Sequence, residues 1–440
     1  MSEKMMKKSR VLIAALLGIV MIAGLTMWSC GDSGTSSYDD PSATTTQSDA
    51  VITAEILNQW IGEGKLNAAL GGRDRVVVVS VSSAADWTGK GHIPGAVRMD
   101  TAEIDTGNIG RIEGLALATR MMPDGPMMDG IIQRLGIDAN TTIVITIPKN
   151  SSINNQSVAF WDYRYWGFAR ERLKILNGGD DAWDVAGLTL ATDATEAYTA
   201  STYSVSNNAS LKDVVRYSIG EIIARVDSLI ATPALKDEWQ MIETLGLTHT
   251  PYLTNALRSV ATQFLTRLDA GDGVTRNYVY PDKATLEARM ASIAVDDGGA
   301  TAYVSPTKKT ICMCGTSTSA SPTFVLFDAV LNVPEGNIIM YDGSYTAQWS
   351  NYSLARLTAQ WPNASAAQLS AWAFDNATAP RAQGAMATAA VPSIWAVAAP
   401  VLGPSDPAMN QIEEADKDYM APATTTTGGA TGGGGGGGGC

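Results

Sequence analysis

Two of the four cysteines of this 440-residue chain lie one residue apart, in the stretch ICMCGTSTSA that begins at Ile311. A glycine and a run of small hydroxyl residues follow Cys314, so the backbone there can curl tightly and aim successive N–H groups at one point. Such a nest stabilises an anion, and we expect it to lower the pKa of Cys314 by about one or two units from the usual value of about 8.5. The pattern predicts a reactive thiolate that works without a metal or another cofactor.

The residues expected to form the loop around that thiolate are Gly315, Thr316, Ser317, Thr318 and Ser319. The glycine is expected to provide the tight curl, and the four hydroxyl groups are expected to donate further hydrogen bonds. The loop has no lysine or arginine, so a doubly charged anion finds little electrostatic help there. Asp342 and Ser344 belong to a later YDGS turn, which we expect to order the chain beside the loop rather than to react.

The other cysteines leave alternatives open. Cys312 lies two residues before Cys314 on a predicted strand, so it is expected on the same face, either as a small buried apolar residue or as a resolving thiol. A disulfide between the two would require distortion, because alternate Cα atoms of a strand lie close to the bridging limit of about 7 Å. Cys440 ends a Thr/Gly tail, and three roles are open: a mobile thiol serving the active site, a point of attachment or processing, or none.

Composition argues against several classes of protein. With two histidines, no CxxCH and no paired CxxC motifs, the chain lacks the usual signatures of covalent haem and of zinc sites. The formal net charge is -13 and there is no basic stripe, so nucleic acid is not expected as a partner. His92 lies beside Pro94 and Gly95 in the stretch GHIPGA, where we expect it to fix a turn by hydrogen bonds rather than to catalyse.

The amino terminus has the features of an export signal. Basic residues precede the apolar run VLIAALLGIVMIAGLTMW, which leads into the small-residue stretch SCGDSG. This resembles a bacterial lipoprotein signal in which residues 1–29 are removed and Cys30 is lipidated; an uncleaved anchor and ordinary secretion are the alternatives. Residues 30–50 are predicted to be a flexible linker. We expect a cell-envelope protein held by a membrane through Cys30, and Gly31 favours the outer membrane, with the protein facing the periplasm or the cell surface.

The elements that would position the Cys314 loop follow from the apolar pattern. RVVVVSV, from Arg75, and TTIVITI, from Thr141, are short β-branched runs typical of buried parallel strands. Helical patterns such as SVAFWDYRYWGFARERL alternate with such runs, which predicts an α/β layered fold. The scheme repeats from Leu211, and LKILNGGDDAW in the first part corresponds to NIIMYDGSYTAQW in the second. This recurrence indicates two domains of one type.

The stretches GKGHIPGAVRMD, LNGGDDAWDVAGLTL, CGTSTSA and YDGSYTAQW resemble signature segments of the rhodanese family. The resemblance implies two rhodanese-like domains, over residues 51–192 and 211–375, each a mainly parallel central sheet flanked by helices. It is poor over residues 225–300, where the second domain lacks its own GHIPGA, so we expect a helical insertion there. A C-terminal extension (376–421) and a disordered tail (422–440) are expected to follow.

The resemblance also implies a sulfurtransferase reaction. Cys314 would be the nucleophile that takes a sulfane sulfur from a donor, holds it as a persulfide and passes it to an acceptor. The corresponding stretch of the first domain, PKNSSINNQS, has no cysteine, so that domain is expected to be inactive. The uncharged loop resembles that of family members that use 3-mercaptopyruvate or persulfide donors more than that of members that use thiosulfate.

The overall layout resembles rhodanese-like lipoproteins encoded with selenite or tellurite reduction and extracellular electron-transfer systems. It implies a small sulfur or selenium compound as substrate, and multihaem cytochromes and outer-membrane conduit proteins as partners. Two other functions remain open. One is a non-catalytic docking subunit of such a conduit, favoured by the missing second GHIPGA; the other is a thiol–disulfide redox protein that uses Cys312, Cys314 and Cys440.

Overall fold

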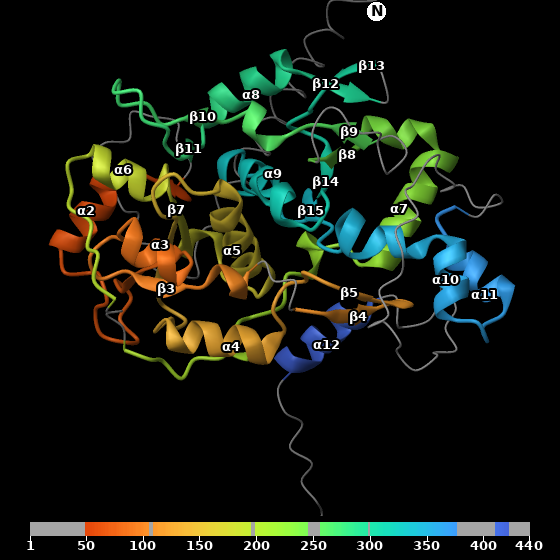
Figure 1. Ribbon diagram of the computed structural model, residues 1–440, viewed down its shortest axis with the longest axis horizontal. Helices are drawn as coiled ribbons and strands as arrows, with labels where there is room; N and C mark the ends of the chain where they lie inside the picture. The colour runs from red at the N-terminus through yellow and green to blue at the C-terminus, as the bar shows by residue number, and fades with distance from the viewer. Residues whose placement is uncertain are drawn as a thin grey trace, which may run out of the picture. The chain divides into compact units, whose positions relative to one another are not determined.

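Two mainly parallel sheets organise the chain (Figure 1). The computed structural model describes residues 49–104, 109–194, 199–244, 256–297, 300–375 and 410–421. The first sheet has the order β1-β7-β6-β2-β3 and all of its neighbouring strands are parallel. Its strands are β1 (Val51–Ile52), β2 (Val76–Val81), β3 (Val97–Met99), β6 (Thr142–Thr146) and β7 (Leu173–Leu176). We call residues 49–194 the first half and residues 199–375 the second half.

The second sheet has the order β13-β12-β9-β8-β14-β15. Its strands are β8 (Trp239–Glu243), β9 (Ala256–Arg258), β12 (Ala294–Asp297), β13 (Ala300–Tyr303), β14 (Lys309–Met313) and β15 (Ile338–Met340). The pairs among β15, β14, β8 and β9 are parallel, whereas β12 pairs antiparallel with β9 and β13. A parallel bridge joins Arg216 to Met340 of β15. Both sheets therefore contain four parallel strands in the same arrangement with a short segment at one edge, which is β1 in the first sheet and the segment at Arg216 in the second.

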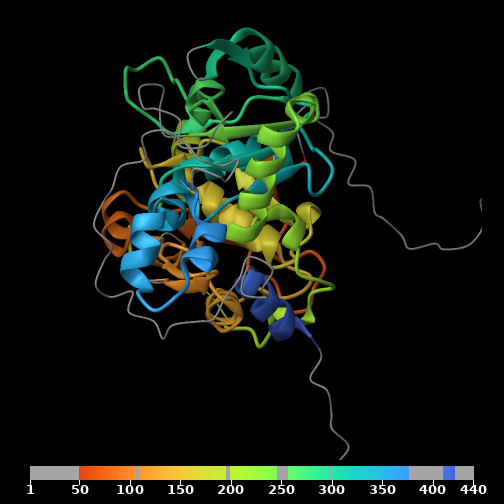
Figure 2. The ribbon, with the colours of Figure 1, turned by 90° about the vertical axis from the view of Figure 1, so that its right-hand side faces the viewer.

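Helices surround the two sheets (Figures 1 and 2). In the first half they are α2 (Ala54–Gly62), α3 (Ala84–Gly89), α4 (Gly125–Arg134), α5 (Ile153–Tyr165) and α6 (Gly179–Val185). The others are α7 (Ile219–Ala231), α8 (Lys283–Ser292), α9 (Ser321–Val325), α10 (Leu354–Gln360), α11 (Ala366–Trp372) and α12 (Gln411–Met420). Two small antiparallel pairs complete the described strands: β4 (Arg111–Glu113) with β5 (Ala116–Ala118), and β10 (Thr266–Arg267) with β11 (Tyr278–Val279). In the part of the chain that the structure describes, no helix combines the length and apolar character needed to span a membrane.

Along the strands of each sheet, successive side chains alternate between a shared central core and a second core on the other face of that sheet. In β2, Val77 and Val79 pack into a large central core, whereas Val76 and Val78 pack into a smaller core on the other face. The central core contains side chains from α4 and α5 of the first half and from α8 and α9 of the second half. The two sheets therefore share one apolar layer, and this confirms the mixed α/β architecture with parallel sheets flanked by helices.

The expected helical insertion at residues 225–300 is wrong. The described residues of that segment contain β8 and β9, two central strands of the second sheet, together with β10, β11, β12 and α8. β8 is only five residues long and contains Gln240 and Glu243, and periodicity alone does not distinguish such a short buried strand from a helix. The lipoprotein signal and linker, most of the C-terminal extension and the tail lie outside the described residues, and the domain boundaries stay predictions.

Candidate active site

Cys314 lies directly after β14, at the carboxyl end of a strand that pairs in parallel with β8 and β15. Strand alternation sends Ile311 and Met313 into the core under α7, whereas Cys312 and Cys314 face the central core. Cys314 is only 1% exposed. A thiol at this end of a parallel sheet occupies the position where α/β proteins commonly bind their ligands, but here it is closed off from solvent.

The loop after Cys314 folds on itself. Ser317 has a left-handed backbone, with φ of 69°, so the strained residue of the curl is a serine, whereas we expected the curl at Gly315. The hydroxyl groups of Ser317 and Thr318 both donate to the carbonyl of Thr316. These two hydroxyl groups are therefore used within the loop, which corrects the expectation that they would serve the thiol.

A second segment, the π-helical turn Ser344–Gln348, clamps the loop. The Oγ of Ser344 accepts hydrogen bonds from the backbone N–H groups of Cys314, at 3.2 Å, and Ser317, at 3.1 Å. In return, the N–H of Tyr345 donates to the carbonyl of Cys314 at 2.9 Å, and that of Thr346 donates to the carbonyl of Gly315 at 2.7 Å. π-Helical turns are rare and are frequently found at functional sites. The structure thus brings the YDGS turn and the cysteine loop together.

The electrostatics of the thiol differ from the sequence-based expectation. Burial raises the pKa of Cys314 above its ordinary value of 9.0, and this effect outweighs the opposing hydrogen bonds. The opposing effect comes first from the backbone N–H groups of Thr316 and Ser319; the N–H of Ala320 and the hydroxyl group of Ser344 also lie near the sulfur, but they donate to the carbonyls of Ser317 and Tyr341. The expected nest is present, but the thiol enclosed by it is protonated at neutral pH, because desolvation disfavours the thiolate more than the nest favours it.

Cys312 is an apolar core residue in its contacts. It is fully buried, its Sγ lies 3.6 Å from the carbonyl oxygen of Ile339 and 3.7 Å from the Sδ of Met340, and burial raises its pKa. Both Cys312 and Cys314 are free thiols. These contacts favour the packing interpretation of Cys312 over the resolving-thiol interpretation.

The counterpart of Cys314 in the first half is Ile147. The N–H of Asp180 donates to the Ile147 carbonyl at 2.9 Å, just as Tyr345 donates to Cys314 at the same distance in the second half. The loop after Ile147 is filled by Asn277, whose side chain accepts from the N–H of Ser151 and donates to the carbonyl of Pro148. The first half therefore has the aliphatic side chain of Ile147 where the second half has the Cys314 thiol, and Asn277 fills the adjoining loop.

His92 lies in the first half, where its ring stacks on Trp87 with 3.6 Å between centroids and its Nδ1 lies 3.2 Å from the Trp87 carbonyl oxygen. Its backbone bridges to Ala191, and the nearby Gly95 has φ of 80°, so only a glycine fits that turn without strain. The GHIPGA segment is therefore built into the first half and contributes nothing to the Cys314 loop.

The sequence analysis did not identify a buried charge cluster that lies beside the π-helical turn Ser344–Gln348. We call Glu113, Arg216, Asp342 and Glu413 the Arg216 cluster. Arg216 is fully buried and pairs with each of the three carboxyl groups at 2.9 to 3.1 Å. Burial raises the pKa of Asp342, and the nearby Arg216 opposes this effect. Only Asp342 had a local sequence signal, its YDGS turn; the other members belong to no sequence motif and come together only in the fold.

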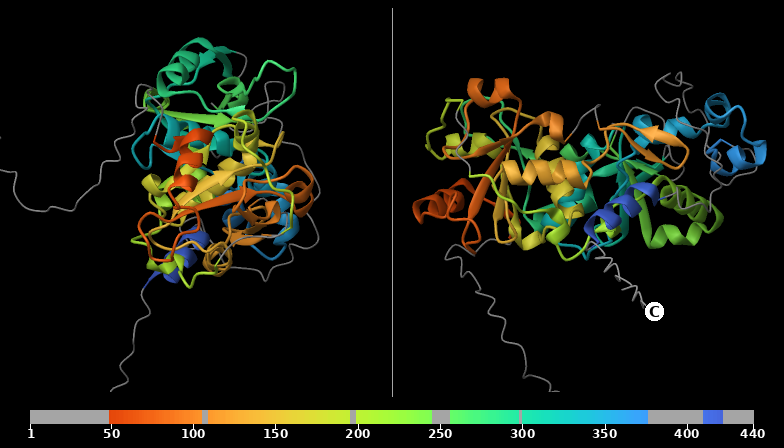
Figure 3. Two further views of the ribbon diagram at one scale, coloured as in Figure 1. Left: turned by 90° about the vertical axis from the view of Figure 1, so that its left-hand side faces the viewer. Right: turned by 90° about the horizontal axis from the view of Figure 1, so that it is seen from below.

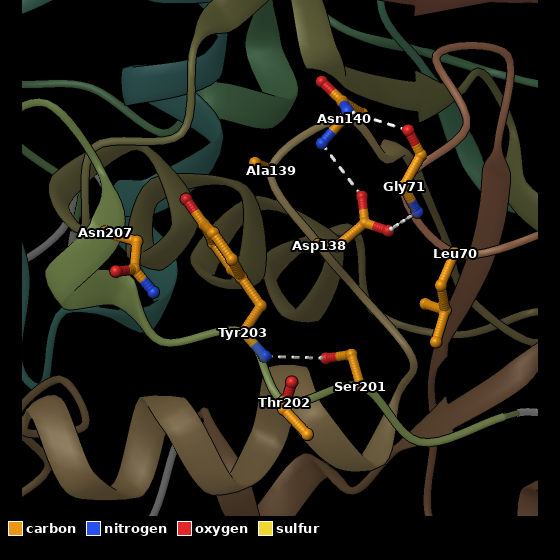
Figure 4. Close-up of a pocket in the computed structure, with 9 residues that line it drawn as sticks. All are labelled: Leu70, Gly71, Asp138, Ala139, Asn140, Ser201, Thr202, Tyr203 and Asn207. Atoms are coloured by element: carbon orange, nitrogen blue, oxygen red, sulfur yellow. Dashed lines mark hydrogen bonds between the residues drawn. The ribbon is translucent and has the colours of Figure 1, made fainter.

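A cavity of about 460 Å³ lies away from the cysteine loop (Figure 4). Its lining residues are Leu70, Gly71, Asp138, Ala139, Asn140, Ser201, Thr202, Tyr203 and Asn207. Residues 138–140 precede β6, so the cavity is at the amino end of the first sheet, whereas Cys314 follows the carboxyl end of β14. None of the predicted site residues lines it. Cys30 and Cys440 lie outside the described residues.

Comparison with known proteins gives one similar curated sequence. The chain is 24% identical over 271 residues to a thiosulfate sulfurtransferase of Corynebacterium glutamicum, and the match covers 59% of this chain and 77% of that protein. No protein-family model matches the chain.

Solved structures with a similar arrangement were also found. The Tum1 protein of Saccharomyces cerevisiae is 17% identical, with a TM-score of 0.48, over 67% of this chain and 93% of that chain. SseA of Escherichia coli, described as a 3-mercaptopyruvate sulfotransferase with the rhodanese fold, is 20% identical, with a TM-score of 0.47, over 68% of this chain and 99% of that chain.

Proposed function

We propose that the protein is a rhodanese-like sulfurtransferase that carries sulfur as a persulfide on Cys314. The observation that carries the proposal is the position of the Cys314 thiol at the carboxyl end of β14, in a loop where the backbone N–H groups of Thr316 and Ser319 oppose the effect of burial on its pKa. Donors arranged in this way stabilise negative charge on sulfur, whether it is on a thiolate or on a persulfide. The similarity to a thiosulfate sulfurtransferase supports the same reaction.

The transfer proceeds in two displacements. The Cys314 sulfur attacks the sulfur to be transferred, which is the thiol sulfur of 3-mercaptopyruvate or the outer sulfur of a persulfide, and a new S–S bond forms. The C–S bond of 3-mercaptopyruvate or the S–S bond of the persulfide breaks, and the rest of the donor leaves with its electron pair and with the Cys314 thiol proton. A nucleophilic acceptor, such as a thiolate, then attacks the outer sulfur of the persulfide and regenerates Cys314. Because Cys314 is buried, the loop must open to admit both reactants.

We further propose that the donor is 3-mercaptopyruvate or a persulfide rather than thiosulfate. Residues 315–319 contain no cation, and two of their hydroxyl groups are bonded to the Thr316 carbonyl. A dianion entering this loop would lose its hydration without gaining a charged partner. A monoanionic donor has a smaller desolvation penalty.

The test is mass spectrometry of the intact chain and of its cysteine-containing peptides after incubation with 3-mercaptopyruvate, a polysulfide, thiosulfate or selenite. A gain of one sulfur on the Cys314 peptide that is absent from Cys314→Ser supports the proposal, and the effective donor identifies the donor class. Cys312→Ser is the matched control, since it should still accept sulfur. No adduct with any sulfur donor would contradict the sulfurtransferase function, and an adduct with selenite would support a role in selenium chemistry.

The redox alternative is the less favoured function. A disulfide between Cys312 and Cys314 would have to remove Cys312 from its contacts with Ile339 and Met340. The same mass measurement after mild oxidation separates the two functions, because a disulfide loses two hydrogens whereas a persulfide gains one sulfur.

We propose a location in the cell envelope, with Cys30 as the lipidated residue. The support is the order of basic residues, apolar run and small residues before Cys30. Metabolic labelling with an alkyne fatty acid should mark the wild-type protein and not Cys30→Ser.

Cytochrome and conduit partners are a further proposal. It is tested by capture of these proteins with the Cys314→Ser variant, since docking should survive a change that stops turnover.

A further inference from the structure

We propose that Glu113, from the first half, and Arg216 are positioning residues of the Cys314 loop, so that the cysteine-free first half is a scaffold for the reaction of the second. This inference rests on the function proposed for Cys314. It assigns a role to Glu113 and Arg216, which make no contact with the thiol and had no signal in the sequence.

The Arg216 cluster is a rigid support. The guanidinium of Arg216 donates to both carboxylate oxygens of Glu113, at 2.9 and 3.2 Å. Its Nε lies 3.0 Å from Asp342, and its Nη1 lies 3.1 Å from Glu413. The side chains of Glu113, Arg216 and Asp342 are 0% exposed. Buried charges persist only where they are paired, so moving Arg216 or Glu113 leaves its partner uncompensated and costs free energy.

The Arg216 cluster holds the chain at two points, one before Ser344 and one after it. Asp342 lies two residues before Ser344, and Gln348, four residues after it, donates from its Nε2 to Glu113 at 3.0 Å. Between these two anchors, Ser344, Tyr345 and Thr346 make the hydrogen bonds to the Cys314 loop described above. Gly343 must be a glycine for this geometry, since a Cβ there would lie 2.0 Å from the Oε1 of Gln348.

The β4–β5 hairpin that supplies Glu113 is inserted into the second half. Its turn residue Gly114 has φ of 64°, and a Cβ there would lie 2.6 Å from the hydroxyl oxygen of Tyr352. That hydroxyl donates to the Glu113 carbonyl at 2.7 Å and accepts from the N–H of Leu115 at 3.0 Å. Leu115 belongs to the core under α7, and the orange hairpin extends toward α10 and α11 (Figure 3). The first half thus contributes part of the second half's interior.

The experiment uses Gln348→Leu, because Glu113→Gln or Arg216→Met would strand buried charges and unfold the chain. This change removes one anchor and leaves Glu113 paired with Arg216. We expect amide hydrogen exchange in residues 314–319, measured by mass spectrometry, to become at least about tenfold faster, as for the loss of a hydrogen bond to a charged group. The persulfide on Cys314 should decay faster by a similar factor.

The matched control is Gln133→Leu. Gln133 is half-buried in α4, and its side chain donates to the carbonyl of Tyr203 at 3.0 Å. Its loss should leave exchange in residues 314–319 at the wild-type rate. Wild-type exchange in Gln348→Leu, or equally fast exchange in both variants, would overturn the inference. Faster exchange in Gln348→Leu alone, with no persulfide on the wild type, would instead mean that the proposed function fails while the positioning stands.

Discussion

At the scale of the residue, the burial of Cys314 makes a direct prediction about pH. Burial raises its pKa above the ordinary 9.0, so we expect alkylation of Cys314 by iodoacetamide at pH 7 to be at least about tenfold slower than for a cysteine in a short peptide. The rate should still be increasing above pH 9. The measurement is mass spectrometry of the Cys314 peptide across pH. A plateau below pH 8 would show the lowered pKa that the sequence suggested.

The same pKa shift affects stability. The folded-state pKa of Cys314 lies above that of the unfolded chain, so the contribution is fully present below the unfolded value and is lost as pH rises through the folded value. Stability should therefore decline in the alkaline range above pH 9.

Glu413 gives a second prediction at this scale, because it shares Arg216 with two other carboxyl groups. Burial raises its pKa from 4.5 to about 8, so its stabilising contribution is complete below pH 4.5 and is lost as pH rises to about 8. Glu413→Gln keeps the size and an acceptor oxygen but does not ionise. We expect it to raise Tm by on the order of 2 °C at pH 8.5 and to change Tm little at pH 4.5.

The control for Glu413 is its neighbour Glu414, whose side chain is 58% exposed and 3.4 Å from Lys417. Glu414→Gln should leave Tm nearly constant at both pH values. A lower Tm for Glu413→Gln at every pH would mean that its ion pair with Arg216 outweighs the cost of burying its charge.

At the scale of the element, what the sequence predicts depends on how local the signal is. The strand before Cys314, the loop after it and the YDGS turn are short continuous patterns, and the structure brings all three together. Glu113 and Arg216 lie 103 residues apart, and neither leaves a pattern of its own. The raised pKa of Cys314 also could not be predicted, because it depends on packing by helices from both halves.

The prediction at the scale of the element concerns the stability of the β4–β5 hairpin. Gly114→Ala should destabilise the protein by about 1–2 kcal/mol for the left-handed backbone and by about another 1–3 kcal/mol for the clash with Tyr352. Gly64→Ala is the matched control, since Gly64 has φ of 75° and nothing within 4 Å of an added Cβ. Chemical denaturation of both variants isolates the packing cost as their difference. Equal losses would mean that the hairpin rests loosely on the second half.

At the scale of the whole molecule, the shared central core predicts that both halves unfold together. Helix α5 of the first half packs on α9 of the second, and its Arg164, 1% exposed, pairs with Asp328 at 3.2 Å and with Glu335 at 2.7 Å. Separate domains usually meet through smaller and more polar surfaces and unfold in separate steps. We expect a single calorimetric transition, with the calorimetric enthalpy equal to the van't Hoff enthalpy.

The variant that tests this cooperativity is Arg164→Met, which removes one of the two arginines paired with the buried Asp328 and leaves Arg170 in place, so it should cost about 1.5–3 kcal/mol, as for the loss of a hydrogen bond to a charged group. If the halves are one cooperative unit, the whole transition moves to lower temperature and remains single. Two transitions, with one of them at the wild-type temperature, would contradict it. A single transition would also explain why a half without a cysteine is retained beside the reactive one: the Cys314 loop is ordered only as long as the first half is folded.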